Sequence, residues 1–253
     1  LWMLCGYTLF TMGNVPMRHS TAVVIFSRTP QLARRSADEP YAALPWEELD
    51  ALFTALLGDT IENACRIADI DILLFRDSKE FSEEFLVPFK GRVRCHDLQG
   101  VSFTAEVQRA IDVVFGEHYN RILLLLENNP AGIPLKLRRM IEQLGQEDDC
   151  IVFTPTVEGK CSALGMKSNY GWLFDPKDGD PIAKPHLLLR RLCSLPTVLV
   201  PMPPEYLLDS GLKLARLREA LEIMREQNQA FPSRTYEMFK LFDKKYKMRK
   251  AVR

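Results

Sequence analysis

An apolar run that ends abruptly in polar residues and a proline is the stretch of this chain best suited to bind a ligand. It reads Arg-Ile-Leu-Leu-Leu-Leu-Glu-Asn-Asn-Pro and spans residues 121–130. A short apolar run bounded by a turn signal is typical of a buried strand in a parallel sheet. Because α/β proteins bind ligands at the carboxyl ends of such strands, we expect Glu127 and Asn128 to lie at a binding edge.

The chemistry available at this edge depends on where the strand ends. Asn128 has an uncharged amide, whereas Mg²⁺ and Mn²⁺ prefer anionic oxygen ligands. Neighbouring side chains of a strand point to opposite faces, so Glu127 can take the place of a charged ligand only if the strand has already ended. The run therefore predicts a ligand-binding edge but gives no support for a metal site.

Elsewhere the sequence lacks the common catalytic and cofactor motifs. It has no P-loop and no G-x-G-x-x-G, H-E-x-x-H or G-x-S-x-G pattern. Its histidines have neither metal-ligand spacing nor a paired nucleophile, so we interpret them as structural or solvent-facing; they are His19, His96, His118 and His186. Its cysteines are widely spaced without a C-x-x-C pair, so we expect reduced core thiols and a cytoplasmic location. They are Cys5, Cys65, Cys95, Cys150, Cys161 and Cys193.

Strands and helices that alternate along the chain would position the binding edge. Apolar runs predict strands, and apolar residues at spacings of three and four predict helices. The predicted strands are residues 21–26, 70–75, a weaker one around 93, 122–126, 150–153 and 197–200; the predicted helices are residues 45–64, 103–115, 135–144, 186–193 and 212–226. A turn signal at Glu158 and Gly159 predicts a hairpin beside the sheet, and residues 168–185 read as a loop at the edge of the site or as a small lobe. The alternation indicates an α/β fold of three layers, α/β/α, with a mostly parallel, mixed sheet.

The composition fits one large domain. The chain has 253 residues, of which 47% are hydrophobic and 26% charged, enough to bury a sizeable core. Thirty-three basic residues balance thirty-three acidic ones, so no overall field attracts nucleic acid or an anionic membrane. We divide the chain into an N-terminal extension at residues 1–20, the α/β domain at residues 21–230 and a basic C-terminal helix at residues 231–253. The apolar start, residues 1–12, is too short to span a bilayer.

The C-terminal segment allows two interpretations. Its aromatic residues recur at helical spacing, and seven basic residues meet one acidic residue, Asp243, between Lys240 and Arg253. We favour a terminal helix docked by its aromatic residues with a solvated basic end, since most charge runs only solvate a surface. The alternative is that residues 240–253 bind nucleic acid, an anionic lipid or another anionic partner.

Three segments in this order resemble bacterial glycosyltransferase-A-like proteins related to nucleotide-diphospho-sugar transferases. Residues 23–30, Val-Val-Ile-Phe-Ser-Arg-Thr-Pro, resemble the opening F-A-K-x-P of that family and its basic loop. Residues 124–130 resemble its I-G-S-D-x-P, and residues 154–166 align without a gap on its G-P-x-x-D-G-G-Y-Y-L-x-G-L. Residues 206–214 are a weaker match to Y-D-V-D-T-P-E-D-L. The resemblance covers about residues 22–221 and implies a nucleotide-diphospho-sugar transferase-like (Rossmann-like) fold.

The departures from that family concern its acidic residues and its basic loop. The position of the metal-binding aspartate is Asn128, the later aspartate is Glu158, and only Asp209 remains of the terminal acidic cluster. The K-T-R pattern of the basic loop becomes Arg-Arg-Ser at residues 34–36. We therefore predict no metal ligands in this chain, and we expect no Mg²⁺ or Mn²⁺ bound as in the family.

By the resemblance, the site contains cations for a diphosphate and two carboxylates. The implied substrate-binding residues are Phe26, Ser27, Arg28, Arg34, Arg35, Glu127, Asn128 and Lys160. The arginines could neutralise a diphosphate leaving group through bidentate hydrogen bonds, although Arg34 and Arg35 could also be ordinary surface residues. The implied catalytic residues are Glu158 and Asp209, either of which could act as a general base on an acceptor hydroxyl. Alternatively Glu158 and Asn128 belong to turns, and Asp209 caps a helix.

Two functional hypotheses follow. The first is a cytoplasmic protein that binds a nucleotide or nucleotide-sugar at the carboxyl edge of its sheet, a glycosyltransferase or nucleotidyltransferase if it is active. The second is a non-catalytic scaffold or regulatory relative that acts through protein partners or its basic C-terminal helix. An open polar cleft around Asn128, Glu158 and Asp209 favours the first, and a cleft filled by aromatic residues favours the second. The aromatic candidates are Tyr170, Trp172 and Phe174.

Overall fold

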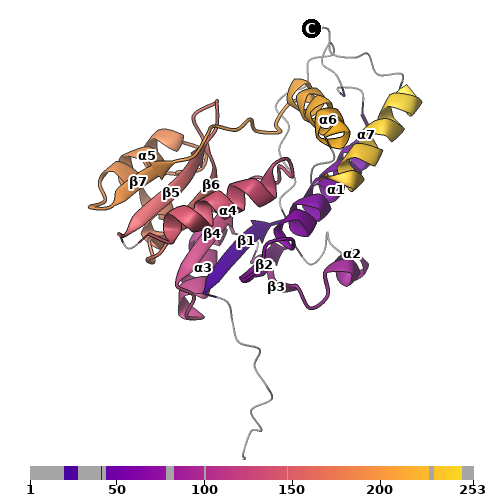
Figure 1. Ribbon diagram of the computed structural model, residues 1–253. Coiled ribbons are helices and arrows are strands. Elements are labelled where there is room, and N and C mark those ends of the chain that lie inside the picture. The colour runs from indigo at the N-terminus through magenta and orange to yellow at the C-terminus, as the bar shows by residue number, and fades with distance from the viewer. Residues whose placement is uncertain are drawn as a thin grey trace, which may run out of the picture.

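Within the described residues, a sheet of seven strands with helices on both faces forms the centre of the molecule (Figure 1). The computed structural model describes residues 20–27, 41, 44–77, 83–99, 101–146, 148–227 and 231–246. The strands are β1 (Thr21–Phe26), β2 (Ile70–Arg76), β3 (Val93–Asp97), β4 (Arg121–Leu125), β5 (Cys150–Pro155), β6 (Cys161–Met166) and β7 (Val198–Pro201). The α-helices are α1 (Trp46–Ala64), α2 (Glu83–Leu86), α3 (Phe103–Gly116), α4 (Ile133–Leu144), α5 (Pro185–Cys193), α6 (Gly211–Glu226) and α7 (Ser233–Tyr246).

The strands lie in the order β3-β2-β1-β4-β6-β5-β7. β1 is parallel to β2 and β4, and β5 is parallel to β7, whereas β6 is antiparallel to both of its neighbours. This mostly parallel, mixed sheet with helices on both faces confirms the fold class predicted from the sequence.

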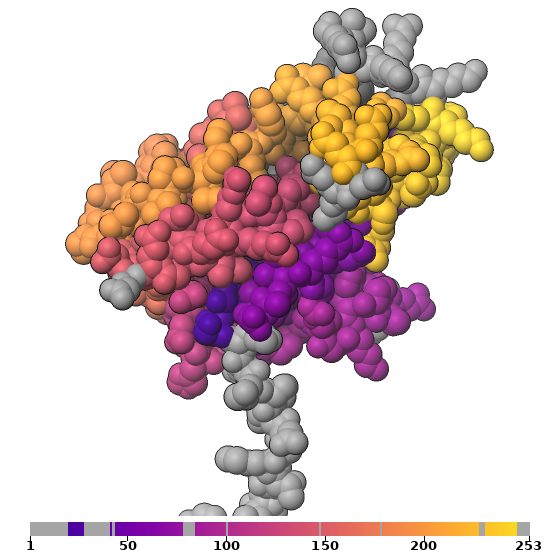
Figure 2. Space-filling view, viewed as in Figure 1, coloured from indigo at the N-terminus to yellow at the C-terminus, as the bar shows by residue number. Residues whose placement is uncertain are grey.

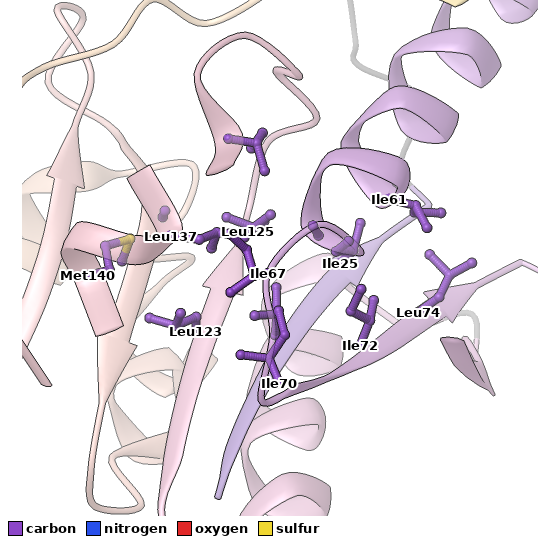
Figure 3. Close-up of a cluster of buried hydrophobic side chains, with 14 of the residues drawn as sticks. Ile25, Ile61, Ile67, Ile70, Ile72, Leu74, Leu123, Leu125, Leu137 and Met140 are labelled. Atoms are coloured by element: carbon purple, nitrogen blue, oxygen red, sulfur yellow. The ribbon is translucent and has the colours of Figure 1, made fainter. Parts of the chain in front are cut away.

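Side chains alternate between two cores, one on each face of the sheet. Ile25 and Leu125 belong to the core beneath α1 and α4, which Figure 3 shows in close-up. Val24 and Leu124 belong to the opposite core, which α3 and α5 cover. Because β1 and β4 are buried on both faces, they read as continuous apolar runs, as central parallel strands do.

A third core joins α6 and α7 to α1 at one end of the molecule (Figures 1 and 2). Phe239 and Phe242 of α7 are buried in it. The buried carboxylate of Asp59 on α1 accepts a hydrogen bond of 2.7 Å from the backbone N–H of Thr235, near the first residue of α7. Aromatic burial and this cap together hold α7 against α1, since a helix start needs acceptors for its first N–H groups.

Most predicted elements are present, with shifts at their ends. The helix expected from residue 135 begins at Ile133. Pro134 is tolerated in its first turn, because the N–H groups there have no partner within the helix and the proline therefore costs no hydrogen bond. β4 ends at Leu125, one residue earlier than expected. Among the described residues, no helix is long and apolar enough to cross a membrane.

The cysteines only partly match the prediction of core thiols. Cys65, Cys150, Cys161 and Cys193 are free thiols. The expectation of burial is wrong for Cys193, on the outer part of α5, and for Cys95, on the edge strand β3, both of which are exposed. Cys5 lies outside the described residues.

Candidate functional site

The candidate site lies at the carboxyl ends of β1 and β4. The two strands run parallel with Ile25 opposite Leu125, so they end side by side. Just beyond them, the Asn128 amide Nδ2 donates a hydrogen bond of 3.0 Å to the carbonyl oxygen of Phe26. Asn128 is buried, and its amide therefore fastens the end of β4 to the end of β1.

A cleft of about 290 Å³ opens beside this strand end. Its walls come from the end of β4, the turn between β5 and β6 with the start of β6, the first residue of α3, the turn before α5 with part of that helix, and the segment before α6. The lining residues are Phe103, Leu126, Glu127, Asn128, Lys160, Cys161, Asp180, Pro181, Ile182, Ala183, Leu188, Leu207 and Asp209. Polar and apolar groups thus share one concave surface, as they do in small-molecule sites.

The early end of β4 decides how its polar residues are arranged. Glu127 follows Leu125 by two residues and is therefore outside the regular alternation of the strand. Both Glu127 and Asn128 line the cleft as a result.

The turn between β5 and β6 forms a second wall. Gly159 has φ +81°, a conformation that favours glycine, and the N–H of Thr156 donates to the carbonyl oxygen of Lys160 at 2.8 Å. The Thr156 hydroxyl also accepts a hydrogen bond of 3.0 Å from the Lys160 N–H. This turn places Lys160 at the cleft and Glu158 at its tip, so Glu158 is a turn residue, as one of the two interpretations of the sequence had it.

Glu158 and Asp209 share one ammonium group. The Lys213 Nζ lies 2.6 Å from Glu158 Oε1 and 2.6 Å from Asp209 Oδ1. Burial works to raise the pKa of Glu158, but the hydrogen bond and charge of Lys213, together with further hydrogen bonds to the carboxylate, lower it overall. Burial works to lower the pKa of Lys213, yet the two carboxylates raise it overall. Glu158 and Lys213 are therefore charged near neutral pH.

The suggestion that Asp209 caps a helix is wrong. Ser210 is the N-cap of α6, and its hydroxyl accepts a hydrogen bond from the Lys213 N–H. Asp209 precedes the cap and lines the cleft, where its carboxylate contacts the Lys213 side chain instead of the helix backbone.

Glu205 fastens the segment before α6 to the β5–β6 hairpin. Its N–H donates to the Pro155 carbonyl at 3.0 Å, and its own carbonyl accepts from the Val157 N–H at 2.9 Å. Its carboxylate Oε2 accepts hydrogen bonds from Lys136 at 3.0 Å and from the Ser162 hydroxyl at 2.9 Å. Lys136 is only 8% exposed, so this ion pair is largely removed from water.

The turn before α5 forms the remaining wall. The Asp180 carboxylate Oδ1 accepts hydrogen bonds from the N–H groups of Ile182 at 2.8 Å and Ala183 at 3.1 Å. The Thr104 hydroxyl of α3 donates to the same oxygen. Asp180 therefore shapes the wall and fixes it to α3.

Only part of the predicted site comes together in the described structure. Glu127, Asn128, Lys160 and Asp209 line one cleft, and Glu158 joins Asp209 through Lys213. Phe26 and Ser27 are buried beneath the strand end, 2% exposed each. Arg28, Arg34 and Arg35 lie outside the described residues.

The aromatic residues considered as fillers do not line the cleft. Phe174 is part of the core beneath α3, and Trp172 is 45% exposed. Tyr170 packs at the edge of that same core and donates its hydroxyl to Asp149. The cleft is therefore open and contains charged side chains, which is the arrangement that the first hypothesis requires.

Sequence reasoning missed Lys213, Asp180 and Phe103 as residues of the site. Asp209 and Lys213 stand four residues apart at a helix start, a spacing that favours an ion pair. That local signal was available. No local signal connects Glu158 to Lys213, because the hairpin and α6 are distant in sequence and meet only in the folded chain.

The donor groups do not fit a divalent ion held as the resemblance would imply. Among the described residues, no group of three His, Cys, Asp or Glu side chains lies close enough to hold a metal ion. Glu158 and Asp209 already bind an ammonium group, and the Asn128 amide donates to a backbone carbonyl. A divalent ion needs several oxygen ligands that face it together, and with the Lys213 ammonium between Glu158 and Asp209 these residues do not supply them.

Comparison with solved structures relates this fold to nucleotide-linked enzymes. No protein-family model and no curated protein sequence matches the chain. A Desulfovibrio desulfuricans G20 protein, provisionally described as a nucleotide-diphospho-sugar transferase, superposes with a TM-score of 0.65 at 12% identity, over 89% of this chain and 96% of that one. A 4-diphosphocytidyl-2C-methyl-D-erythritol synthase from Anaerococcus prevotii DSM 20548 has a TM-score of 0.51 at 9% identity, over 81% and 96%. The chain has a nucleotide-diphospho-sugar transferase-like fold.

Proposed function

We propose that this protein binds a nucleotide or nucleotide-sugar in the cleft at the carboxyl edge of its sheet, without the divalent metal usual for the family it resembles. The observation that carries the proposal is the open cleft next to the ends of β1 and β4, lined by Glu127, Asn128, Lys160 and Asp209. In open α/β sheets, ligands bind at this edge. The likeness of the fold to a described nucleotide-diphospho-sugar transferase supports the ligand class by analogy.

The lining of the cleft suits a ligand with both rings and charge. Leu126, Ile182 and Leu207 give it apolar surface for a base or sugar ring. Lys160 supplies a cation for a phosphate group. In the sequence, Arg28 directly follows Ser27, the residue after β1, whose last residue, Phe26, accepts the hydrogen bond from Asn128.

A cytoplasmic location is part of this proposal. Cys65, Cys150, Cys161 and Cys193 are free thiols. Proteins of oxidising compartments commonly pair their cysteines, whereas thiols stay reduced in the cytosol.

A thermal-shift screen tests the proposal. UDP-, GDP- and CDP-linked ligands are added with and without Mg²⁺ or Mn²⁺, and we expect at least one of them to raise the Tm, with little further gain from metal. Lys160→Ala should weaken that response, whereas Lys177→Ala, at an exposed lysine outside the cleft, should not. A screen in which no nucleotide raises the Tm refutes the proposal.

One observation favours a second candidate, a non-catalytic relative that binds a ligand or a protein partner without transferring a group. A general base must accept a proton, and the contact with Lys213 lowers the pKa of Glu158 and so makes it a weaker base. The basic C-terminal helix gives this candidate less support, because Lys245 pairs with Glu48 of α1 and Lys240 pairs with Glu237. Release of nucleotide from a bound nucleotide-sugar, in the presence of acceptor sugars, would support transfer and count against this candidate.

A further inference from the structure

The charge arrangement around Lys213 is unusual for the start of a helix. Lys213 is the third residue of α6, where the aligned peptide dipoles and unpaired N–H groups disfavour a cation. The two carboxylates of Glu158 and Asp209 overcome this cost, because each approaches the ammonium to 2.6 Å. The Lys213 side chain is only 17% exposed, so its charge depends on these partners more than on water.

The position of the ammonium is the position that a bridging metal ion would need. Mg²⁺ and Ca²⁺ sit about 2.0–2.6 Å from carboxylate oxygens, and the Lys213 Nζ is 2.6 Å from one oxygen of Glu158 and one of Asp209. A divalent ion between these two carboxylates would overlap the ammonium and be repelled by it. The metal and the lysine side chain therefore exclude one another at this place.

We propose that the Lys213 ammonium is the resident cation of this site, that it takes the place of a divalent ion between Glu158 and Asp209, and that it keeps metal out. The inference rests on the proposed function for its role in ligand binding, but not for the competition between lysine and metal. With the ammonium in place, the three side chains carry a net charge of −1, whereas a divalent ion between the same carboxylates would give a neutral group. The positive charge that a phosphate ligand needs must therefore come from other residues, of which Lys160 lines the cleft in the described part of the chain.

Removal of the ammonium should convert the two carboxylates into a metal site. In Lys213→Ala, Glu158 and Asp209 keep their positions through the hairpin turn and the Ser210 cap, which do not involve the lysine side chain. The start of α6 also favours the carboxylates left behind. We expect the variant to bind one Mn²⁺ at about 0.1–1 mM, as weak oxygen-ligand sites do, and the wild type to bind it at least about tenfold more weakly.

The increase in Mn²⁺ affinity is measured by titration with Mn²⁺ alone. Binding is monitored through the loss of the electron paramagnetic resonance signal of the free ion. Lys213→Ala/Glu158→Gln and Lys213→Ala/Asp209→Asn should lose it, which places the ion between the two carboxylates. Lys240→Ala is the matched control, because it removes an exposed lysine whose carboxylate partner in the described structure is Glu237, and it should gain nothing. Circular dichroism establishes that each variant is folded.

Two results would overturn the inference. One is a folded Lys213→Ala that binds Mn²⁺ no better than the wild type. The other needs no lysine variant. If the wild type binds one Mn²⁺ and Glu158→Gln abolishes that binding, metal and ammonium do not compete. Since no nucleotide is present, these outcomes are separate from the thermal-shift screen, and either proposal can fail while the other stands.

Discussion

The ion pair between Lys136 and Glu205 gives the sharpest prediction about stability. Lys136→Met removes the ammonium and keeps the apolar stem of the side chain, so among the described residues it leaves the Glu205 carboxylate with the Ser162 hydroxyl as its side-chain donor. Removal of one partner of a buried pair costs about 3–5 kcal/mol, whereas an exposed pair contributes about 0–1 kcal/mol. Lys136 is 8% exposed and Glu205 21%, so water recovers part of the lost solvation. We expect the free energy of unfolding to fall by about 2 kcal/mol.

That loss corresponds to a fall in Tm of about 4–8 °C for a domain of this size. Urea denaturation monitored by circular dichroism measures the loss in free energy of unfolding. An unchanged slope of that free energy against urea concentration shows that the unfolded state is unaffected. Lys240→Met, at a lysine 51% exposed beside a glutamate 66% exposed, is the control and should change stability by less than about 0.5 kcal/mol.

A double variant separates the lost attraction from the charge left behind. Lys136→Met/Glu205→Gln should recover part of the stability, because Gln can still accept from Ser162 without carrying a buried charge. If Lys136→Met is no more costly than the exposed control, the pair is not removed from water as described and the reasoning fails.

Three further predictions concern single residues. The folded-state pKa of Glu158 is lowered, so its contribution to stability is present above its ordinary pKa near 4.5 and is lost as the pH falls through the lowered value. In acid unfolding, Glu158→Gln should therefore lose less free energy of unfolding below pH 4.5 than the wild type does. Burial raises the pKa of the Cys161 thiol to about 12, so mass spectrometry after iodoacetamide treatment at pH 7.5 should find it labelled far more slowly than the exposed Cys193. A Cβ at Gly165 would lie 2.8 Å from Leu123 Cδ2, so Gly165→Ala should cost about 1–3 kcal/mol in chemical denaturation, and a neutral result would mean that β4 and β6 pack more loosely than described.

The sheet could be predicted because its signals are local. The apolar runs of β1 and β4 are long enough and bounded clearly enough to identify strands without knowledge of their partners. The Glu158–Gly159 turn marked the hairpin in the same way, and Gly159 does take the positive φ that favours glycine. The predicted place of the hairpin beside the sheet is wrong, because β5 and β6 pair within the sheet, between β4 and β7. Such features depend on neighbouring residues, which a sequence displays directly.

The arrangement of the site could be predicted only in part, because its contacts join distant segments. Glu158 and Asp209 were identified through resemblance to a family, yet the lysine that binds both was not, since nothing near Glu158 in the sequence points to α6. The role of Asn128 also depended on a partner that the sequence does not show, the carbonyl at the end of β1. Local sequence patterns therefore identify the edge of the sheet, but they do not show which charged side chains of distant segments pair there.

The reversed direction of β6 separates the stability of the sheet from the shape of the cleft. β6 runs antiparallel to both of its neighbours, β4 and β5. The turn that precedes β6, residues 156–160, therefore lies at the edge of the sheet where β4 ends. Lys160, the last residue of that turn, lines the cleft, whereas the strands on either side carry buried apolar side chains. Changes in the length or sequence of the turn can thus alter what the cleft accepts while the strand register stays fixed. This makes residues 156–160 a natural place for ligand preference to diverge among related chains, and the first place to vary in redesign of the cleft.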